Sequence, residues 1–84
     1  MALHIAQSYK DLLAEAKEAE ANADLQQAAK LFERAAKQEP LEEYSYNRLM
    51  IIYRKLYNYE KELKIIEKAI TTFEAFIKRN LKEF

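Results

Sequence analysis

The chain has 84 residues, no cysteine, no glycine, one proline and a formal net charge of zero. Its length limits it to a single domain over residues 1–84 with a small core, and the lack of cysteine excludes disulfides and cysteine metal sites. A balanced charge gives no electrostatic footprint for nucleic acid, and no apolar run is long enough to span a bilayer. We expect a cytoplasmic protein without membrane segments.

Helix-forming residues occupy almost every position, so the sequence predicts an all-α fold. Four helices are expected, at about residues 5–21, 24–37, 42–56 and 59–80. Pro40 divides them into two pairs, because it has no backbone donor and biases Glu39 away from the helical conformation. Each pair should form an antiparallel helical hairpin, and the two hairpins should stack.

Short polar segments predict a tight turn within each pair. These segments are "NADLQQA" at residues 22–28 and "YNYEKEL" at residues 57–63. Asn22 or Asp24 in the first segment, and Asn58 in the second, can cap the following helix by accepting backbone N–H bonds.

The two pairs repeat each other at a spacing of 34 residues. The heptapeptide "KLFERAA" at residues 30–36 returns as "KIIEKAI" at residues 64–70. One hairpin cannot bury its own apolar face, but a second hairpin stacked on it can. The expected core combines the aligned apolar positions of both pairs, namely Leu12, Ala16, Ala28, Leu31, Phe32, Ala35, Tyr46, Leu49, Met50, Tyr53, Ile66 and Ala69.

Small and aromatic residues occupy fixed positions in each pair of helices, and their spacing is similar to that of a known repeat family. They are Ala16, Ala28, Phe32, Ala35 and Pro40 in the first pair, and Tyr46, Leu49, Tyr53, Tyr59 and Ala69 in the second. This pattern resembles the tetratricopeptide repeat, with repeats at about residues 9–42 and 43–76 and a helical extension at about residues 74–84. Glu74 stands where the family has a closing proline, so the last helix can run on. Glu62 stands where the family packs an alanine, so we expect looser packing or a carboxylate that reaches solvent.

The resemblance implies a non-catalytic protein–protein interaction module or scaffold that binds a peptide or a helix in a concave groove. The first helix of each pair would line this groove, with Lys10, Leu13, Lys17, Tyr44, Asn47, Ile51, Arg54 and Lys55. These residues recur at helical spacing on one face and combine cations, an amide and apolar groups, which suits an acidic or carboxylate-ended peptide. The alternative is an ordinary solvated helix face.

The C-terminal segment carries an apolar stripe at helical spacing, which includes Phe73, Phe76, Ile77, Leu81 and Phe84. Two repeats are fewer than the three that such arrays need, so this segment should compensate. It could shield the end of the stack, or it could bind a second copy or another protein, because such a stripe rarely stays exposed on a monomer. It could also be the raw edge of a longer array.

Charge adds one further alternative for association. Residues 1–42 contain five Lys and Arg against eight Asp and Glu, and residues 43–84 contain nine against six. Ends of opposite sign would favour head-to-tail contact between copies, but the alternative, a chance distribution of charge, is the interpretation that we prefer for so short a chain.

The sequence contains no pattern typical of an enzyme. His4 is the only histidine, Ser8 and Ser45 have no histidine partner, and a chain without glycine has no phosphate-binding loop. We therefore predict no catalytic activity, no cofactor and no metal.

Single-stranded RNA is the alternative ligand, because aromatic and cationic residues interleave along the third helix and the turn after it. The residues concerned are Tyr44, Tyr46, Arg48, Tyr53, Arg54, Lys55, Tyr57 and Tyr59. In the repeat interpretation, however, Tyr46, Tyr53 and Tyr59 take packing positions. We therefore rank RNA below a protein partner.

Overall fold

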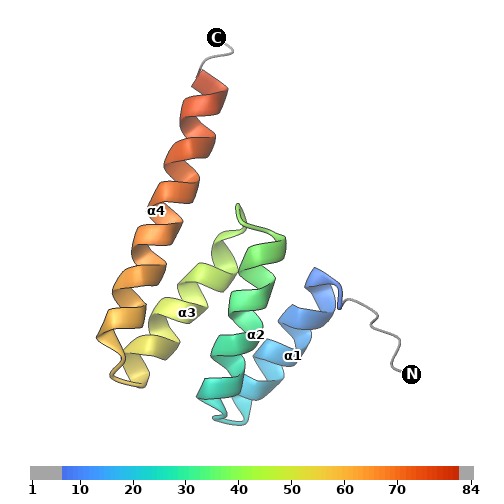
Figure 1. Ribbon diagram of the computed structural model, residues 1–84. Coiled ribbons are helices and arrows are strands. Elements are labelled where there is room, and N and C mark those ends of the chain that lie inside the picture. Colours follow the sequence, from blue (N-terminus) through green and yellow to red (C-terminus); the bar gives the residue numbers. More distant parts are fainter. Residues whose placement is uncertain (1–6, 82–84) are drawn as a thin grey trace, which may run out of the picture.

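A computed structural model of the protein describes residues 7–81, all of whose regular structure is helical. The helices are α1 (Tyr9–Ala21), α2 (Leu25–Gln38), α3 (Glu43–Lys55) and α4 (Tyr59–Leu81). The main packing contacts join α1 to α2, α2 to α3 and α3 to α4, so the helices form two hairpins stacked in chain order (Figure 1). The prediction of an all-α fold with two stacked hairpins is confirmed.

The expected helix boundaries are correct except at the start of α1. This helix was expected from residue 5 but begins at Tyr9, because the extended Ser8 caps it: the Ser8 hydroxyl accepts the Asp11 N–H at 3.1 Å. Residues 5 and 6 lie outside the described part of the chain. The other three helices begin and end within one residue of the expected positions.

The turn of the first hairpin is built around Ala23, which has a φ of 61°. The Ala23 N–H donates to the Glu20 carbonyl at 3.0 Å, and the Asp24 N–H donates to the Ala19 carbonyl at 2.9 Å. These two bonds define a Schellman motif, which satisfies the last carbonyls of a helix by means of one left-handed residue. That residue is usually glycine, which this sequence does not contain.

The turn of the second hairpin has the same geometry 34 residues later. Tyr57 has a φ of 57°, and its N–H donates to the Arg54 carbonyl at 3.0 Å. The Asn58 N–H donates to the Tyr53 carbonyl at 2.8 Å. The internal repeat therefore extends from the pattern of apolar residues to the backbone conformation of the turns.

Each turn leads directly into a capped helix. The Asp24 carboxylate accepts the Gln27 N–H at 3.3 Å, and the Asn58 side-chain carbonyl accepts the Lys61 N–H at 3.2 Å. Both predicted caps are confirmed. Asn22, the alternative cap in the first turn, instead ends α1 by donating its N–H to the Glu18 carbonyl.

The core lies between the hairpins and contains all but two of the expected residues, together with Ala29, Ala36, Ile52 and Ile65, which were not expected. Its apolar members are Leu12, Ala16, Ala28, Ala29, Leu31, Phe32, Ala35, Ala36, Tyr46, Leu49, Ile52, Tyr53, Ile65 and Ala69. Met50 and Ile66 were expected in the core but are only half-buried. Their counterparts 34 residues earlier, Ala16 and Phe32, are fully buried. The second hairpin covers the first, whereas no helix among the described residues covers the second.

The last helix is longer than its neighbours. α4 has 23 residues and α3, which runs antiparallel to it, has 13. The Tyr46 and Phe73 rings meet edge to face at 6.0 Å close to the start of α3, so the end of α4 projects past the other helices (Figure 1). Within residues 7–81, no helix combines the length and apolar character needed to cross a membrane.

Candidate functional site

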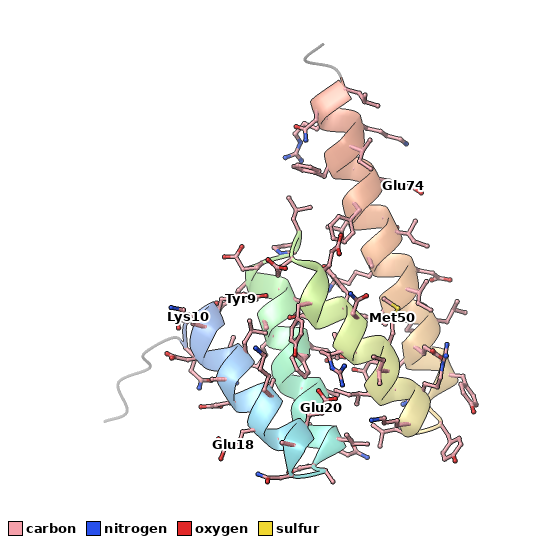
Figure 2. The ribbon with its side chains drawn as sticks, turned by 180° about the vertical axis from the view of Figure 1, so that it is seen from behind. Tyr9, Lys10, Glu18, Glu20, Met50 and Glu74 are labelled. Atoms are coloured by element: carbon pink, nitrogen blue, oxygen red, sulfur yellow. The ribbon has the colours of Figure 1, made fainter. Side chains whose placement is uncertain are left out.

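The proposed groove residues of α1 differ in exposure. Lys10 and Lys17 are exposed, and Figure 2 shows Lys10 pointing away from the helices at the start of α1. Leu13 is half-buried and packs against the core. The Lys17 ammonium lies 5.0 Å from the centre of the Tyr44 ring, a cation–π contact that joins α1 to α3.

The proposed groove residues of α3, which are Tyr44, Asn47, Ile51, Arg54 and Lys55, are all exposed. The structure divides them between the two sides of this helix. Tyr44 lines a hollow of about 310 Å³ between α1 and α3, together with Lys17, Glu20, Ala21 and Arg48. Ile51, Arg54 and Lys55 line a larger hollow of about 520 Å³ between α3 and α4, together with Met50, Tyr57 and Glu62. Two hollows therefore flank α3, and Lys10, Leu13 and Asn47 are not among the residues that line either of them.

An ion pair forms part of the first hollow. Glu20 near the end of α1 accepts two hydrogen bonds from the Arg48 guanidinium of α3, one of them from Nε at 3.1 Å. Both side chains are largely buried, with 15% and 28% of their surfaces exposed. The hydrogen bond to Glu20 raises the pKa of Arg48. This bidentate pair holds the first helices of the two hairpins together, and the sequence analysis did not identify it.

The second hollow contains an unexpected buried carboxylate. Glu62 is 7% exposed, and its Oε2 lies 2.8 Å from Nε of Arg54. The expectation that the Glu62 carboxylate reaches solvent is therefore wrong, because Glu62 is buried beside Arg54 at the interface between α3 and α4. The alternative expectation, looser packing of the second hairpin, agrees with the hollow that Glu62 lines between these helices. Arg54 is correspondingly engaged, which leaves Lys55 as the unpaired cation among the described residues that line this hollow.

The residues proposed for association do not all lie on the exposed side of α4. Phe73 is half-buried against Tyr46, whereas Phe76, Ile77 and Leu81 are 41%, 55% and 62% exposed. Phe84 lies outside the described residues, as does His4.

The sequence analysis missed two exposed residues on the same helix, Leu63 and Ile70, at 56% and 52%. Together with the half-buried Ile66 they extend the apolar face along the whole of α4. We name this face the α4 ridge, and it consists of Leu63, Ile66, Ile70, Ile77 and Leu81. The signal was present in the sequence, because these residues recur three, four or seven positions apart.

A cationic cleft between α2 and α4 was also missed. It encloses about 270 Å³ and is lined by Glu33, Ala36, Lys37, Tyr53, Lys61, Lys64, Ile65 and Lys68. At its base the Tyr53 hydroxyl donates to the Glu33 carboxylate. Burial of the ring is the main cause of the raised pKa of Tyr53, and this hydrogen bond raises the pKa further. The spacing of Lys61, Lys64 and Lys68 places these three side chains on one face of α4. The sequence did not show that α2, with Lys37, lies opposite this face.

The aromatic residues proposed for RNA stacking are dispersed. Tyr46 and Tyr53 are buried in the core, as the repeat interpretation predicted, but Tyr59 is 59% exposed, which that interpretation did not predict. Tyr57 is also exposed and meets Tyr59 edge to face at 6.4 Å. Within α3 itself only Tyr44 offers an accessible ring, so this helix does not present a continuous stacking surface.

Similarity to characterised proteins gives no further indication of function. Comparison of the chain with protein-family models, with curated proteins and with solved structures finds no match.

Proposed function

We propose that this chain is a non-catalytic protein–protein interaction module of the tetratricopeptide-repeat type that acts in the cytoplasm. The repeat assignment is supported by the spacing of 34 residues together with the matching turns at Ala23 and Tyr57. Modules of this kind recognise other proteins through surfaces made by several helices, without forming or breaking covalent bonds.

The observation that carries the proposal is the exposed α4 ridge. Four of its five side chains, all except Ile66, are more than half exposed. An exposed apolar surface of this kind, here with Glu74 between Ile70 and Ile77, is typical on a small protein of a site that another protein covers. The end of α4, which carries Ile77 and Leu81, projects past the other helices (Figure 1).

The second proposed surface is the pair of hollows that flank α3. They combine exposed cations with apolar contacts, notably Lys55 beside Ile51 and Lys17 beside Tyr44. An acidic peptide would find one positive charge on each side of α3. The Arg54–Glu62 pair reduces the positive charge available, so we expect weak, salt-dependent binding here.

Light scattering over a concentration series tests the use of the ridge. Ile77→Asp and Leu81→Asp should each weaken association, because they place a charge on the ridge, while far-ultraviolet circular dichroism should show unchanged helicity. Ala75→Asp is the matched control, since it adds the same charge to an exposed position of α4 on the side away from the ridge. If both apolar variants associate like the wild type, the ridge is not the binding surface.

Fluorescence anisotropy with a labelled acidic peptide tests the hollows separately. Lys17→Glu and Lys55→Glu should each reduce the affinity. A chain that neither associates nor binds an acidic peptide would contradict the proposed function as a whole.

A further inference from the structure

The outer faces of the first and last helices differ in polarity. The internal repeat allows each residue on these faces to be compared with its counterpart 34 positions away. α3 buries Ser45, Leu49 and Ile52 on the side that also carries Arg48, which contacts α1. Moving back by 34 residues, the counterparts on α1 are Asp11, Glu15 and Glu18, and all three are exposed. Figure 2 shows Glu18 pointing away from the helices. The outer face of α1 therefore carries carboxylates where the inner helix carries buried groups.

At the other end of the stack, the outer face of α4 is as apolar as the corresponding buried face of α2. α2 faces α3 with Ala29, Phe32 and Ala36, which are 5%, 0% and 2% exposed. Contacts of Phe32 with Tyr44 and of Glu33 with Tyr53 identify this side of α2. Moving forward by 34 residues, the counterparts on α4 are Leu63, Ile66 and Ile70, which belong to the exposed α4 ridge. The side of α4 that corresponds to a buried side of α2 has no cover among the described residues.

We propose that a second copy of this chain covers the ridge, with the two α4 helices packed antiparallel about a twofold axis. This inference rests on the proposed function and specifies its partner. Head-to-tail addition would place Asp11, Glu15 and Glu18 against the ridge, and burying unpaired carboxylates on an apolar surface is strongly unfavourable. A twofold contact instead brings the ridge against itself and closes after two copies, with one exposed carboxylate of each copy, Glu74, at the margin of the contact.

Charges beside the ridge select an antiparallel register. Opposing Leu63 of one copy to Leu81 of the other aligns the ridges over about 27 Å, at about 1.5 Å per residue. In this register Glu67 lies one residue, or about 1.5 Å along the helix axis, from the position opposite Lys78 of the second copy, which is within reach of the two long side chains. Both residues are exposed, both lie on the same side of the ridge, and neither forms an ion pair within residues 7–81. Since equivalent sides meet in an antiparallel pair, the twofold axis generates the Glu67–Lys78 contact twice.

Charge reversal tests both the partner and the register. The wild-type chain should form a dimer in light scattering, and the mass should not rise beyond two copies at higher concentration. Glu67→Lys and Lys78→Glu should each weaken the dimer by about tenfold, because each variant creates two like-charge contacts. An equimolar mixture of the two variants should regain the wild-type affinity, because both contacts in the mixed dimer again join opposite charges. The double variant Glu67→Lys/Lys78→Glu should regain it as well.

Lys68→Glu is the control, since it makes the same charge change on the side of α4 that faces the cationic cleft, and it should leave the dimer unchanged. A monomer at all concentrations, a mass that keeps growing, or a mixture of variants that stays as weak as its components would overturn the inference. If Leu81→Asp abolishes association while the charge variants have no effect, the ridge remains the binding surface and only the proposed antiparallel register is wrong. If Leu81→Asp has no effect, the use of the ridge itself fails.

Discussion

Replacing Ala23 by glycine should stabilise the protein, although glycine is usually destabilising in a helical protein. Ala23 has a φ of 61°, in the left-handed region that costs a residue with a Cβ roughly 1–2 kcal/mol. Glycine removes this cost but adds about 0.4–1 kcal/mol of conformational entropy to the unfolded chain. The side chain of Ala23 is exposed, so little packing is lost. We expect a net gain of about 0.5–1 kcal/mol in the free energy of unfolding.

The matched control is Ala14→Gly, which makes the same chemical change at an exposed position in the interior of α1. There glycine should lower the free energy of unfolding by about 1 kcal/mol. Urea unfolding, followed by circular dichroism, would measure the free energy of unfolding of both variants. In thermal unfolding, each kcal/mol should move the melting temperature of a domain of this size by about 4–8 °C. Opposite signs support the left-handed turn. If Ala23→Gly destabilises the protein as much as Ala14→Gly does, residue 23 is not left-handed in solution.

Two further substitutions test the core and its polar edge. Phe32→Ala should lower the free energy of unfolding by about 3–5 kcal/mol in denaturant titrations, because the ring is fully buried and meets Tyr44 edge to face; a loss below about 1 kcal/mol would contradict the packing. Tyr53→Phe should change the pH dependence of stability. Burial and the bond to Glu33 raise the folded-state pKa of Tyr53 above 10.0, so its contribution is complete below about pH 10 and is lost as the pH rises toward the folded value. The wild type should lose up to about 1.4 kcal/mol per pH unit more than Tyr53→Phe above pH 10, and parallel stability curves would refute this assignment.

The fold could be predicted from the sequence because several local signals agreed. Helix propensity, the caps at Asp24 and Asn58 and the break at Pro40 all indicated the same four helices. The repeat then indicated how the hairpins stack. The late start of α1 was the exception: Ser8 is a residue type that caps helices, like Asp24 and Asn58, but it was not recognised as the cap that the structure shows it to be.

The errors in the predicted core have a common physical cause. Aligning the repeats treats each residue as though it had the surroundings of its counterpart, but the last hairpin has a neighbour on one side only. Met50 and Ile66 were expected to be as buried as Ala16 and Phe32 for this reason. Burial at the end of a stack depends on whether another helix packs against that end, and periodicity within the chain does not contain that information.

The polar interactions of the candidate sites were harder to predict than the apolar ones. Glu20 with Arg48 and Arg54 with Glu62 join different helices, so no local spacing reveals them. The interhelical angle and the relative rotation of α3 and α4 determine whether a carboxylate such as Glu62 meets a cation or solvent. By contrast, the α4 ridge could have been recognised in full, because its spacing lies within a single helix.

The order of packing contacts along the chain has a consequence for synthesis of the protein. Each main interface joins a helix to the one that precedes it, so α1 and α2 can begin to pair before α3 has been translated, and α3 then covers the apolar face of their hairpin. Contacts between neighbours in sequence close only short loops, which favours folding in microseconds to milliseconds, far faster than a ribosome adds the next helix. The chain should therefore fold during synthesis from its N-terminus. The acidic outer face of α1 is then exposed to solvent from the beginning of synthesis. The apolar α4 ridge is translated after the other three helices, when they can already be folded.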